Sequence, residues 1–201
     1  MTGVVLPDRS GAHLLPGEIE RPDPLPPRSA RVAEIVEAAR KVLEEQGPDS
    51  LTMRRLAEEL GMQAPSLYKH FPGKAGVELA LIEDALSDIG EVSHEAIHQP
   101  GSDGRLISLL DAYHRYSVSH PNLYRLATTG PLPRDQLPSG LEEWAGNPWF
   151  VVTGAPCLAQ ALWSFAHGMV ILELDDRYPP GSDLDETWRT GAAAFARSVK
   201  P

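Results

Sequence analysis

The residues with the clearest capacity for chemistry lie in the run His94-Glu95-Ala96-Ile97-His98. Histidines four residues apart share one face of a helix, where they can bind zinc, and the glutamate between them can act as a general base. This HExxH spacing is typical of zinc peptidases, and Gly101 extends the match toward the metzincin pattern. The next ligand position is Gly104, however, and Pro100-Gly101 ends the helix without a third ligand. We therefore predict no catalytic residues and no metal site, and keep a peptidase only as a minor alternative. Whether the two histidines contact a metal without catalysis stays open.

A second stretch, from Leu51 to Lys74, has the spacing of two short helices joined by a tight turn. Apolar residues recur at helical spacing from Thr52 to Leu60, and charged residues occupy the other faces. Gly61 suits the left-handed conformation that ends a helix, and Pro65 suits the first turn of the next helix. The second helix then presents small, hydroxyl and cationic groups outward. Such a pair exists mainly to place one helix in a DNA groove.

The net charge of −10 argues against DNA as a partner until its distribution is considered. Residues 1–27 carry two basic and four acidic side chains, residues 28–74 carry eight and seven, and residues 75–201 carry eight and seventeen. The acidity therefore belongs to the part of the chain after the helix pair. Locally placed cations can still bind phosphate, and repulsion of the acidic remainder would orient the protein on DNA.

Several classes of protein do not fit the composition. A single cysteine, Cys157, excludes an intramolecular disulfide, which fits a reducing cytoplasm. The N-terminus lacks the pattern of a signal peptide. The most apolar run, residues 155–174, is interrupted by polar and charged side chains, so we predict a buried helix and no membrane span.

The remaining periodicity predicts an all-α fold. We expect helices over residues 29–46, 74–98, 104–119, 122–127, 141–152, 156–178 and 182–199. Residues 1–27, with six prolines, are predicted to form a disordered or extended arm, and whether it contacts DNA stays open. We expect a helix-turn-helix DNA-binding domain over residues 28–74, and a helical ligand-binding and dimerisation domain over residues 75–201.

The helix pair resembles the DNA-binding head of TetR/AcrR-type transcriptional regulators over about residues 28 to 90. The matching residues are Leu51-Thr52, Arg54, Leu56-Ala57, Leu60-Gly61, Pro65-Ser66-Leu67-Tyr68, His70-Phe71 and Lys74. The resemblance implies a homodimeric repressor that binds a palindromic operator in double-stranded DNA, requires no cofactor and is released by a small-molecule inducer. It also implies DNA contacts, by hydroxyl and cationic groups on phosphate and by the leading residues of the second helix on base edges. The implied DNA-binding residues are Thr52, Arg54, Ala64, Pro65, Ser66, Tyr68, Lys69, His70 and Lys74.

Aromatic and histidine residues after the head are the candidates for the ligand pocket, for which we expect an apolar or aromatic molecule. The Trp163, His167 and Gly168 set resembles the Trp-His-Gly signature of one TetR ligand-domain subgroup. We expect close approach of another helix at Gly168, and a satisfied core histidine is the alternative for His167. A ligand-binding or protein-binding module with a degenerate head is the alternative for the whole chain. The candidate pocket residues are Tyr113, Tyr116, Trp149, Phe150, Trp163 and His167.

Overall fold

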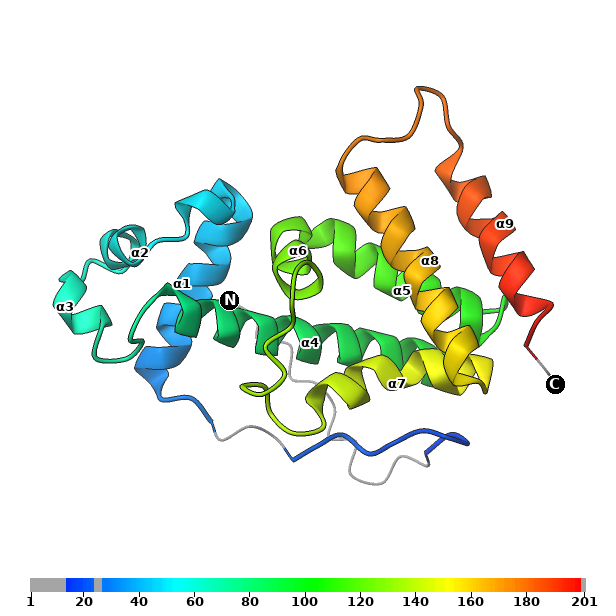
Figure 1. Ribbon diagram of the computed structural model, residues 1–201, viewed down its shortest axis with the longest axis horizontal. Helices are drawn as coiled ribbons and strands as arrows, with labels where there is room; N and C mark the ends of the chain where they lie inside the picture. Colours follow the sequence, from blue (N-terminus) through cyan, green and yellow to red (C-terminus); the bar gives the residue numbers. More distant parts are fainter. Residues whose placement is uncertain (1–13, 24–26, 200–201) are drawn as a thin grey trace.

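The computed structural model describes residues 14–23 and 27–199, and these residues form helices and loops without a strand. This confirms the predicted all-α fold. A head of three helices lies at one end of the long helix α4, and the later helices pack around the rest of it (Figure 1). The elements are α1 (Ala30–Gln46), the short 3-10 helix η1 (Pro48–Ser50), α2 (Met53–Glu59), α3 (Ala64–Leu67), α4 (Lys74–His98), α5 (Arg105–Ser119), α6 (Pro121–Thr128), α7 (Leu141–Thr153), α8 (Pro156–Leu174) and α9 (Leu184–Ala196).

Local capping explains where the helices of the head begin and end. The Ser29 hydroxyl accepts a hydrogen bond from the Val32 amide at 3.3 Å and caps α1. Gly61, two residues after the end of α2, has a φ of 62°, and the Met62 amide donates to the Ala57 carbonyl at 2.8 Å. This is the Schellman arrangement, which requires a left-handed residue at the position of Gly61. The predicted turn of the helix pair is therefore confirmed.

The core of the head extends beyond residues 28–74. Leu56 of α2 and Leu67 of α3 are fully buried in one cluster with Leu123 of α6. The Glu44 carboxylate on α1 accepts hydrogen bonds from the backbone amides of Asn122 at 3.2 Å and Leu123 at 2.9 Å. Helix α6 is thus bonded directly to the head, and a displacement of α6 would strain or break its hydrogen bonds to α1.

Helix α8 is less covered than the sequence predicts. It ends at Leu174 rather than near residue 178, and only 28% of its most apolar window is buried within the chain. By length and composition alone it could cross a membrane, and it is the one helix in the described ranges of which this is true. A Cβ atom at Gly168 would meet no neighbouring atom within 4 Å, so the expected close approach at this glycine is wrong for the single chain. The close helix contacts lie instead at Gly90 and Gly191.

Residues 14–23, which we call the strap, are packed on the later helices, which corrects the disordered alternative predicted for this part of the arm. They run along the outer side of α7 (Figure 1), and Arg21 reaches Glu91 on α4. Leu15 packs against the core of the later helices, and the backbone amide of Ile19 donates a hydrogen bond to the Asn147 side chain on α7. The rest of the predicted arm, residues 1–13 and 24–26, lies outside the described residues.

The contact at Gly90 yields a test of the packing between α4 and α7. A Cβ atom at Gly90 would lie 2.3 Å from Cζ3 of Trp144, whose ring is buried and stacked on His94 and therefore cannot move aside. We expect Gly90→Ala to lower the free energy of unfolding by about 1–3 kcal/mol, as overpacking does. Urea unfolding followed by circular dichroism measures the change.

Gly76→Ala is the matched control because it lies in the same helix. Its Cβ atom would lie 3.4 Å from Phe71, an ordinary contact, so the better helix propensity of alanine should leave stability unchanged or raise it by up to about 1 kcal/mol. Equal effects of the two substitutions would contradict the packing argument.

Candidate DNA-binding surface and ligand cavity

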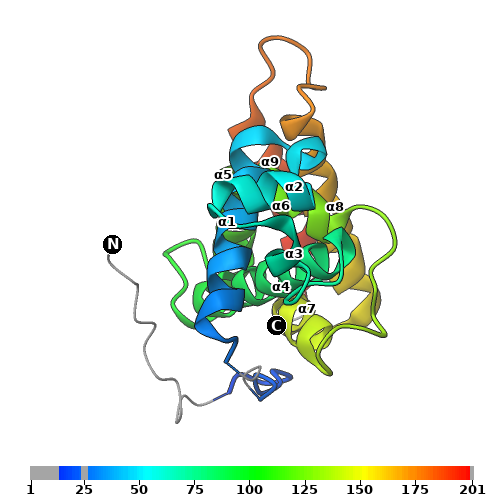
Figure 2. The ribbon, with the colours of Figure 1, turned by 90° about the vertical axis from the view of Figure 1, so that its left-hand side faces the viewer.

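The second helix of the pair, α3, lies at the end of the head that faces the viewer in Figure 2. The Tyr68 side chain is 51% exposed, and Lys69 and His70 beside it are exposed too. Leu67 and Phe71, on either side of these three, are buried and fix the backbone between them. An aromatic residue exposed between two buried anchors is available for a partner, whereas Phe71 serves only the core. At the start of the helix, Pro65 is exposed and Ala64 and Ser66 are half-buried.

Two predicted residues of α2 have local partners. The Thr52 hydroxyl accepts a hydrogen bond from the Arg55 amide at 3.1 Å and so caps α2, which leaves its own proton free to donate outward. Arg54 is largely exposed and forms an ion pair with Glu58 at 3.0 Å. Exposed pairs of this kind contribute about 1 kcal/mol or less, so Arg54 can be redirected to another anion at low cost.

Lys74 opens α4 beside the head. Its ammonium group lies 3.3 Å from the Glu78 carboxylate and 3.4 Å from the Pro48 carbonyl. Gly73 before it supplies no side-chain cap, so the first amides of α4 remain available to an anion. A cation and a helix N-terminus therefore occupy the same place.

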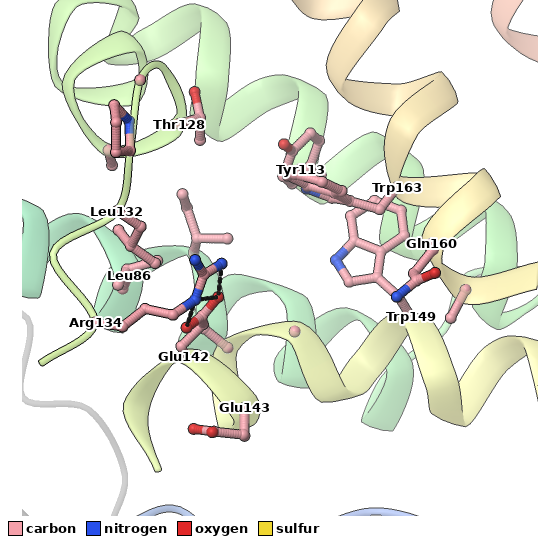
Figure 3. A pocket seen from close by; sticks show the side chains of 17 residues that line it. Leu86, Tyr113, Thr128, Leu132, Arg134, Glu142, Glu143, Trp149, Gln160 and Trp163 are labelled. Atoms are coloured by element: carbon pink, nitrogen blue, oxygen red, sulfur yellow. Dashed lines mark hydrogen bonds and ion pairs between the residues drawn. The ribbon is translucent and has the colours of Figure 1, made fainter. Parts of the chain in front are cut away.

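A cavity of about 610 Å³ lies among α4, α5, α7, α8 and the loop after α6. The rings of Tyr113, Trp149 and Trp163 gather on one side, and the ion pair between Arg134 and Glu142 lies on the other (Figure 3). The nitrogen and oxygen of that pair are 2.7 Å apart. The lining residues are Leu86, Ile89, Tyr113, Ala127, Thr128, Gly130, Pro131, Leu132, Arg134, Glu142, Glu143, Ala145, Gly146, Trp149, Ala159, Gln160 and Trp163.

Three of the six predicted pocket residues line this cavity, and Tyr116, Phe150 and His167 do not. Tyr116 is buried, and its hydroxyl donates to Asp88 on α4 at 3.3 Å. Phe150 faces the strap, where its ring would lie 3.0 Å from a Cβ atom at Gly17. These two aromatic residues were misplaced because helical spacing alone does not say which neighbour covers each face.

His167 belongs to a hydrogen-bonded chain beside the cavity. The hydroxyls of Tyr113 and Tyr124 are 2.8 Å apart, and the Tyr124 hydroxyl is 2.7 Å from Nδ1 of His167. Burial raises the pKa of Tyr113, raises the pKa of Tyr124 to about 12 and lowers the pKa of His167. The hydroxyls therefore stay protonated and a neutral imidazole can accept from Tyr124. A satisfied histidine, the alternative considered for His167, describes this geometry.

Sequence patterns missed the cavity wall formed by the loop after α6. Leu132 and Arg134 of this loop lie outside the periodic segments, and only the folded chain brings them to the cavity. Leu86 and Ile89 of α4 were detectable in principle, because residues three apart share a helix face.

The two histidines of the HExxH run have protein partners. Nδ1 of His94 lies 2.7 Å from Oε1 of Glu18, and its Nε2 lies 3.0 Å from the Trp144 carbonyl oxygen. Nε2 of His98 lies 2.8 Å from Oε1 of Glu18. In the ranges that the structure describes, no group of three or more side chains is arranged to hold a metal ion. Glu18, on the strap, is the partner that the spacing of the histidines could not reveal.

Two family profiles match the chain at the places where the head and the cavity lie. Residues 35–81 match the profile described as bacterial regulatory proteins of the tetR family. Residues 106–195 match the profile described as a tetracyclin repressor-like C-terminal domain. An HTH-type transcriptional regulator of Mycobacterium tuberculosis, Rv0681, is 30% identical over 70% of this chain and 68% of its own length. The chain belongs to the TetR family.

Other comparisons agree with this assignment to the TetR family. The class A tetracycline repressor from transposon 1721 of Escherichia coli is 46% identical over 54 residues, which are 27% of this chain and 25% of the repressor. A solved structure from Rhodococcus sp. RHA1 has the same fold, with a TM-score of 0.69 at 21% identity over 87% of this chain and 97% of that one. The protein is thus a TetR-family transcriptional regulator with a DNA-binding helix-turn-helix. Its placement in the Trp-His-Gly subgroup stays a prediction.

The lowered pKa of His167 predicts a pH effect on stability. Because burial disfavours the imidazolium, the unfolded chain takes up a proton at His167 at a higher pH than the folded chain does. The contribution of His167 to stability is therefore lost as the pH falls through the ordinary range of histidine. We expect His167→Gln, whose amide oxygen can still accept from Tyr124, to lose less thermal stability than the wild type between about pH 7.5 and pH 5.5.

Differential scanning calorimetry at the two pH values checks this expectation. His70→Gln, which replaces an exposed histidine of the head, is the control and should follow the wild type. An equal loss of stability in His167→Gln and the wild type would rule out the role assigned to burial of His167.

Proposed function

We propose that this TetR-family regulator represses transcription as a cytoplasmic homodimer on a palindromic operator, and that a small apolar or aromatic inducer in the cavity releases it. The recognition surface consists of the nine residues named from the sequence, with half-site centres about 34 Å apart or a multiple of that distance. The division into a DNA-binding domain over residues 28–74 and a ligand-binding and dimerisation domain over residues 75–201 is part of this proposal.

One observation carries the proposal. The same helix, α4, lines the cavity with its middle and contributes its first residue to the proposed DNA-binding surface. Leu86 and Ile89 line the cavity, and Lys74 begins the same helix about three turns away, roughly 18 Å along its axis. An uninterrupted helix moves as a rod, so a ligand that displaces α4 at Leu86 also displaces Lys74. Release needs a ligand that prefers the displaced arrangement to the one that DNA selects.

A second connection runs through α6. Ala127 lies in the cavity lining and also in the core of the head. Glu44 on α1 holds the N-terminus of α6 through the amides of Asn122 and Leu123. The cavity therefore contacts the head through two helices at once, which supports a mechanism in which the ligand changes the position of the head.

The cavity suits a small molecule with aromatic character. Its volume falls within the range of about 300–1,000 Å³ that is usual for such sites. Aromatic rings provide flat apolar contact area, while Gln160 and the Arg134–Glu142 pair offer polar contacts that can orient the ligand.

A second copy of the chain is the proposed cover for α8 and α9. Leu172 is 43% exposed on α8, and much of the apolar surface of this helix is left open by the single chain. Contiguous exposed apolar surface on a helix is typical of protein–protein interfaces, which supports this proposal. Two copies related by a twofold axis would present two heads to a symmetric operator. The E. coli relative is named a repressor, which supports repression as the mode of regulation.

The DNA surface is tested by selecting bound sequences from a random duplex library and measuring affinity for the selected operator by fluorescence anisotropy. We expect Lys74→Ala and Tyr68→Ala to weaken binding by about 1–3 kcal/mol each. Lys74→Ala should also reduce the slope of log K against log salt by about 1, because one phosphate contact is lost.

Arg115→Ala removes a single positive charge from the exposed face of α5, outside the head, and should bind like the wild type. Circular dichroism verifies that each variant folds. Unchanged affinity of folded Lys74→Ala and Tyr68→Ala would refute the assigned contacts. The absence of any selected sequence would favour the alternative of a ligand-binding or protein-binding module with a degenerate head.

The cavity is tested at Gly146, which lines it from α7 and where a Cβ atom would meet nothing within 4 Å. Gly146→Phe should fill the cavity and weaken binding of the apolar dye Nile red by about tenfold or more, while Gly146→Ala should bind the dye like the wild type. Dye fluorescence measures both affinities. Equal dye binding by the two variants would place the ligand site elsewhere.

A further inference from the structure

The strap binds both α4 and α7. The Asn147 amide on α7 accepts a hydrogen bond from the Ile19 amide at 3.1 Å and donates to the Gly17 carbonyl at 3.0 Å. Arg21 reaches α4, where its guanidinium lies 2.7 Å from Glu91 and 2.8 Å from the Ser87 hydroxyl. The strap therefore clamps α7 to α4 from the outside.

A buried carboxylate forms the middle of this clamp. The Glu18 side chain is 3% exposed, and its two oxygens are contacted by the Leu15 amide at 2.8 Å, by His94 at 2.7 Å and by His98 at 2.8 Å. The His94 ring also stacks on Trp144, and the Arg21 guanidinium lies 4.9 Å from the centre of the Trp144 ring. A carboxylate this deeply buried is tolerated only because all its partners are donors.

The hydrogen bonds of His94 require one more proton than a neutral histidine and an ionised Glu18 together supply. One ring nitrogen of His94 faces the Trp144 carbonyl oxygen at 3.0 Å, and the other faces Glu18. A carbonyl and an ionised carboxylate both only accept hydrogen bonds, whereas a neutral imidazole has a single N–H. Both bonds therefore exist together only when His94 is an imidazolium or when Glu18 carries the proton. Loss of that proton removes one of the two bonds.

We propose that residues 14–23 are a proton-dependent latch, in which the Glu18–His94–His98 cluster holds α7 against α4 while it retains its extra proton and releases the strap when the proton leaves. Helix α7 supplies Glu142, Glu143, Ala145, Gly146 and Trp149 to the cavity, so the latch sets the position of one cavity wall. The latch does not depend on the proposed function. Its effect on inducer affinity does rest on the proposed function.

The charged groups around the cluster are paired or exposed, so they do not control its extra proton. Arg21 and Glu91 neutralise each other beside the cluster, and Arg105 is bonded to the Ile97 carbonyl next to His98. From α7 the neutral side chains of Trp144 and Asn147 face the strap, and Glu20 and Glu95 are exposed. The extra proton is thus controlled by the three members of the cluster.

The pKa of the Glu18 carboxyl determines the pH at which acid removes the stabilising effect of the cluster. Burial raises its pKa, but hydrogen bonds from the Leu15 amide, His98 and His94 lower it, and the pKa ends below its ordinary value. A carboxylate with a lowered pKa contributes stability that is lost only as the pH falls through that low value. Release of the strap by loss of the extra proton is therefore expected when the pH is raised, and not when it is lowered.

Hydrogen–deuterium exchange of the full chain tests the latch, with EDTA present and with rates corrected for the chemical effect of pH. The wild type should protect the amides of Leu15 and Ile19 at about pH 6 and lose about tenfold or more of that protection by about pH 8.5. Glu18→Gln should protect them equally at both pH values, because a glutamine amide can donate to a neutral His94 without an extra proton. Glu20→Gln makes the same change of charge at an exposed neighbour and should behave like the wild type.

Glu18→Ala tests the link to α7 and should release the strap at every pH. It should also raise exchange in α7 but leave α2 and α3 unchanged. The latch is overturned if wild-type protection does not depend on pH, or if Glu18→Gln keeps the wild-type pH dependence. Unchanged exchange in α7 of Glu18→Ala would overturn the claim that the strap positions the cavity wall. These readouts need neither DNA nor an inducer, so they are independent of the proposed function.

Discussion

The participation of α4 in two separate hydrophobic cores is the constraint on which the rest of the molecule depends. Its first half contributes Val77 and Leu81 to the core of the head, and its second half contributes Ile89 and Ile97 to the core of the later helices. A helix that belongs to two cores cannot move in one of them without disturbing the other. Protein interiors are packed as tightly as crystals, so such a disturbance is resolved by a switch between discrete arrangements rather than by gradual deformation.

The parts of the fold that local physics decides were predictable from the sequence. Ser29, Thr52 and Gly61 mark helix ends through hydrogen bonds that reach only a few residues, and both bounds of α4 were predicted correctly. The family resemblance rests on the same local patterns, which is why it identified the head correctly. Tyr68 also follows this logic, because an aromatic residue between two buried anchors is forced outward by the helix period.

The parts that depend on contacts between distant segments were not predictable. Glu18 meets His94 and His98 across most of the N-terminal half of the chain, and proline content alone suggested an arm without partners. Tyr116 and Phe150 were assigned to the pocket because they are aromatic and helical, but Asp88 and the strap cover them. The exposure of α8 has the same origin: its composition predicts a covered helix, and in the single chain much of its apolar surface has no cover.

The strap changes how the coupling between cavity and head is to be understood. Regulation needs two arrangements that differ by only a few kcal/mol, because allosteric coupling free energies are typically about 1–3 kcal/mol. Gly90 lets Trp144 approach α4 so closely that α7 has little freedom while the strap is docked, since Trp144 then lies between α4 and Arg21. A buried cluster that loses one hydrogen bond with one proton changes the energy of this contact by a similar amount. The free energy that the latch can contribute is therefore similar to the free-energy difference between the two arrangements that it would bias. A wholly apolar contact would instead hold α7 in one position at every pH.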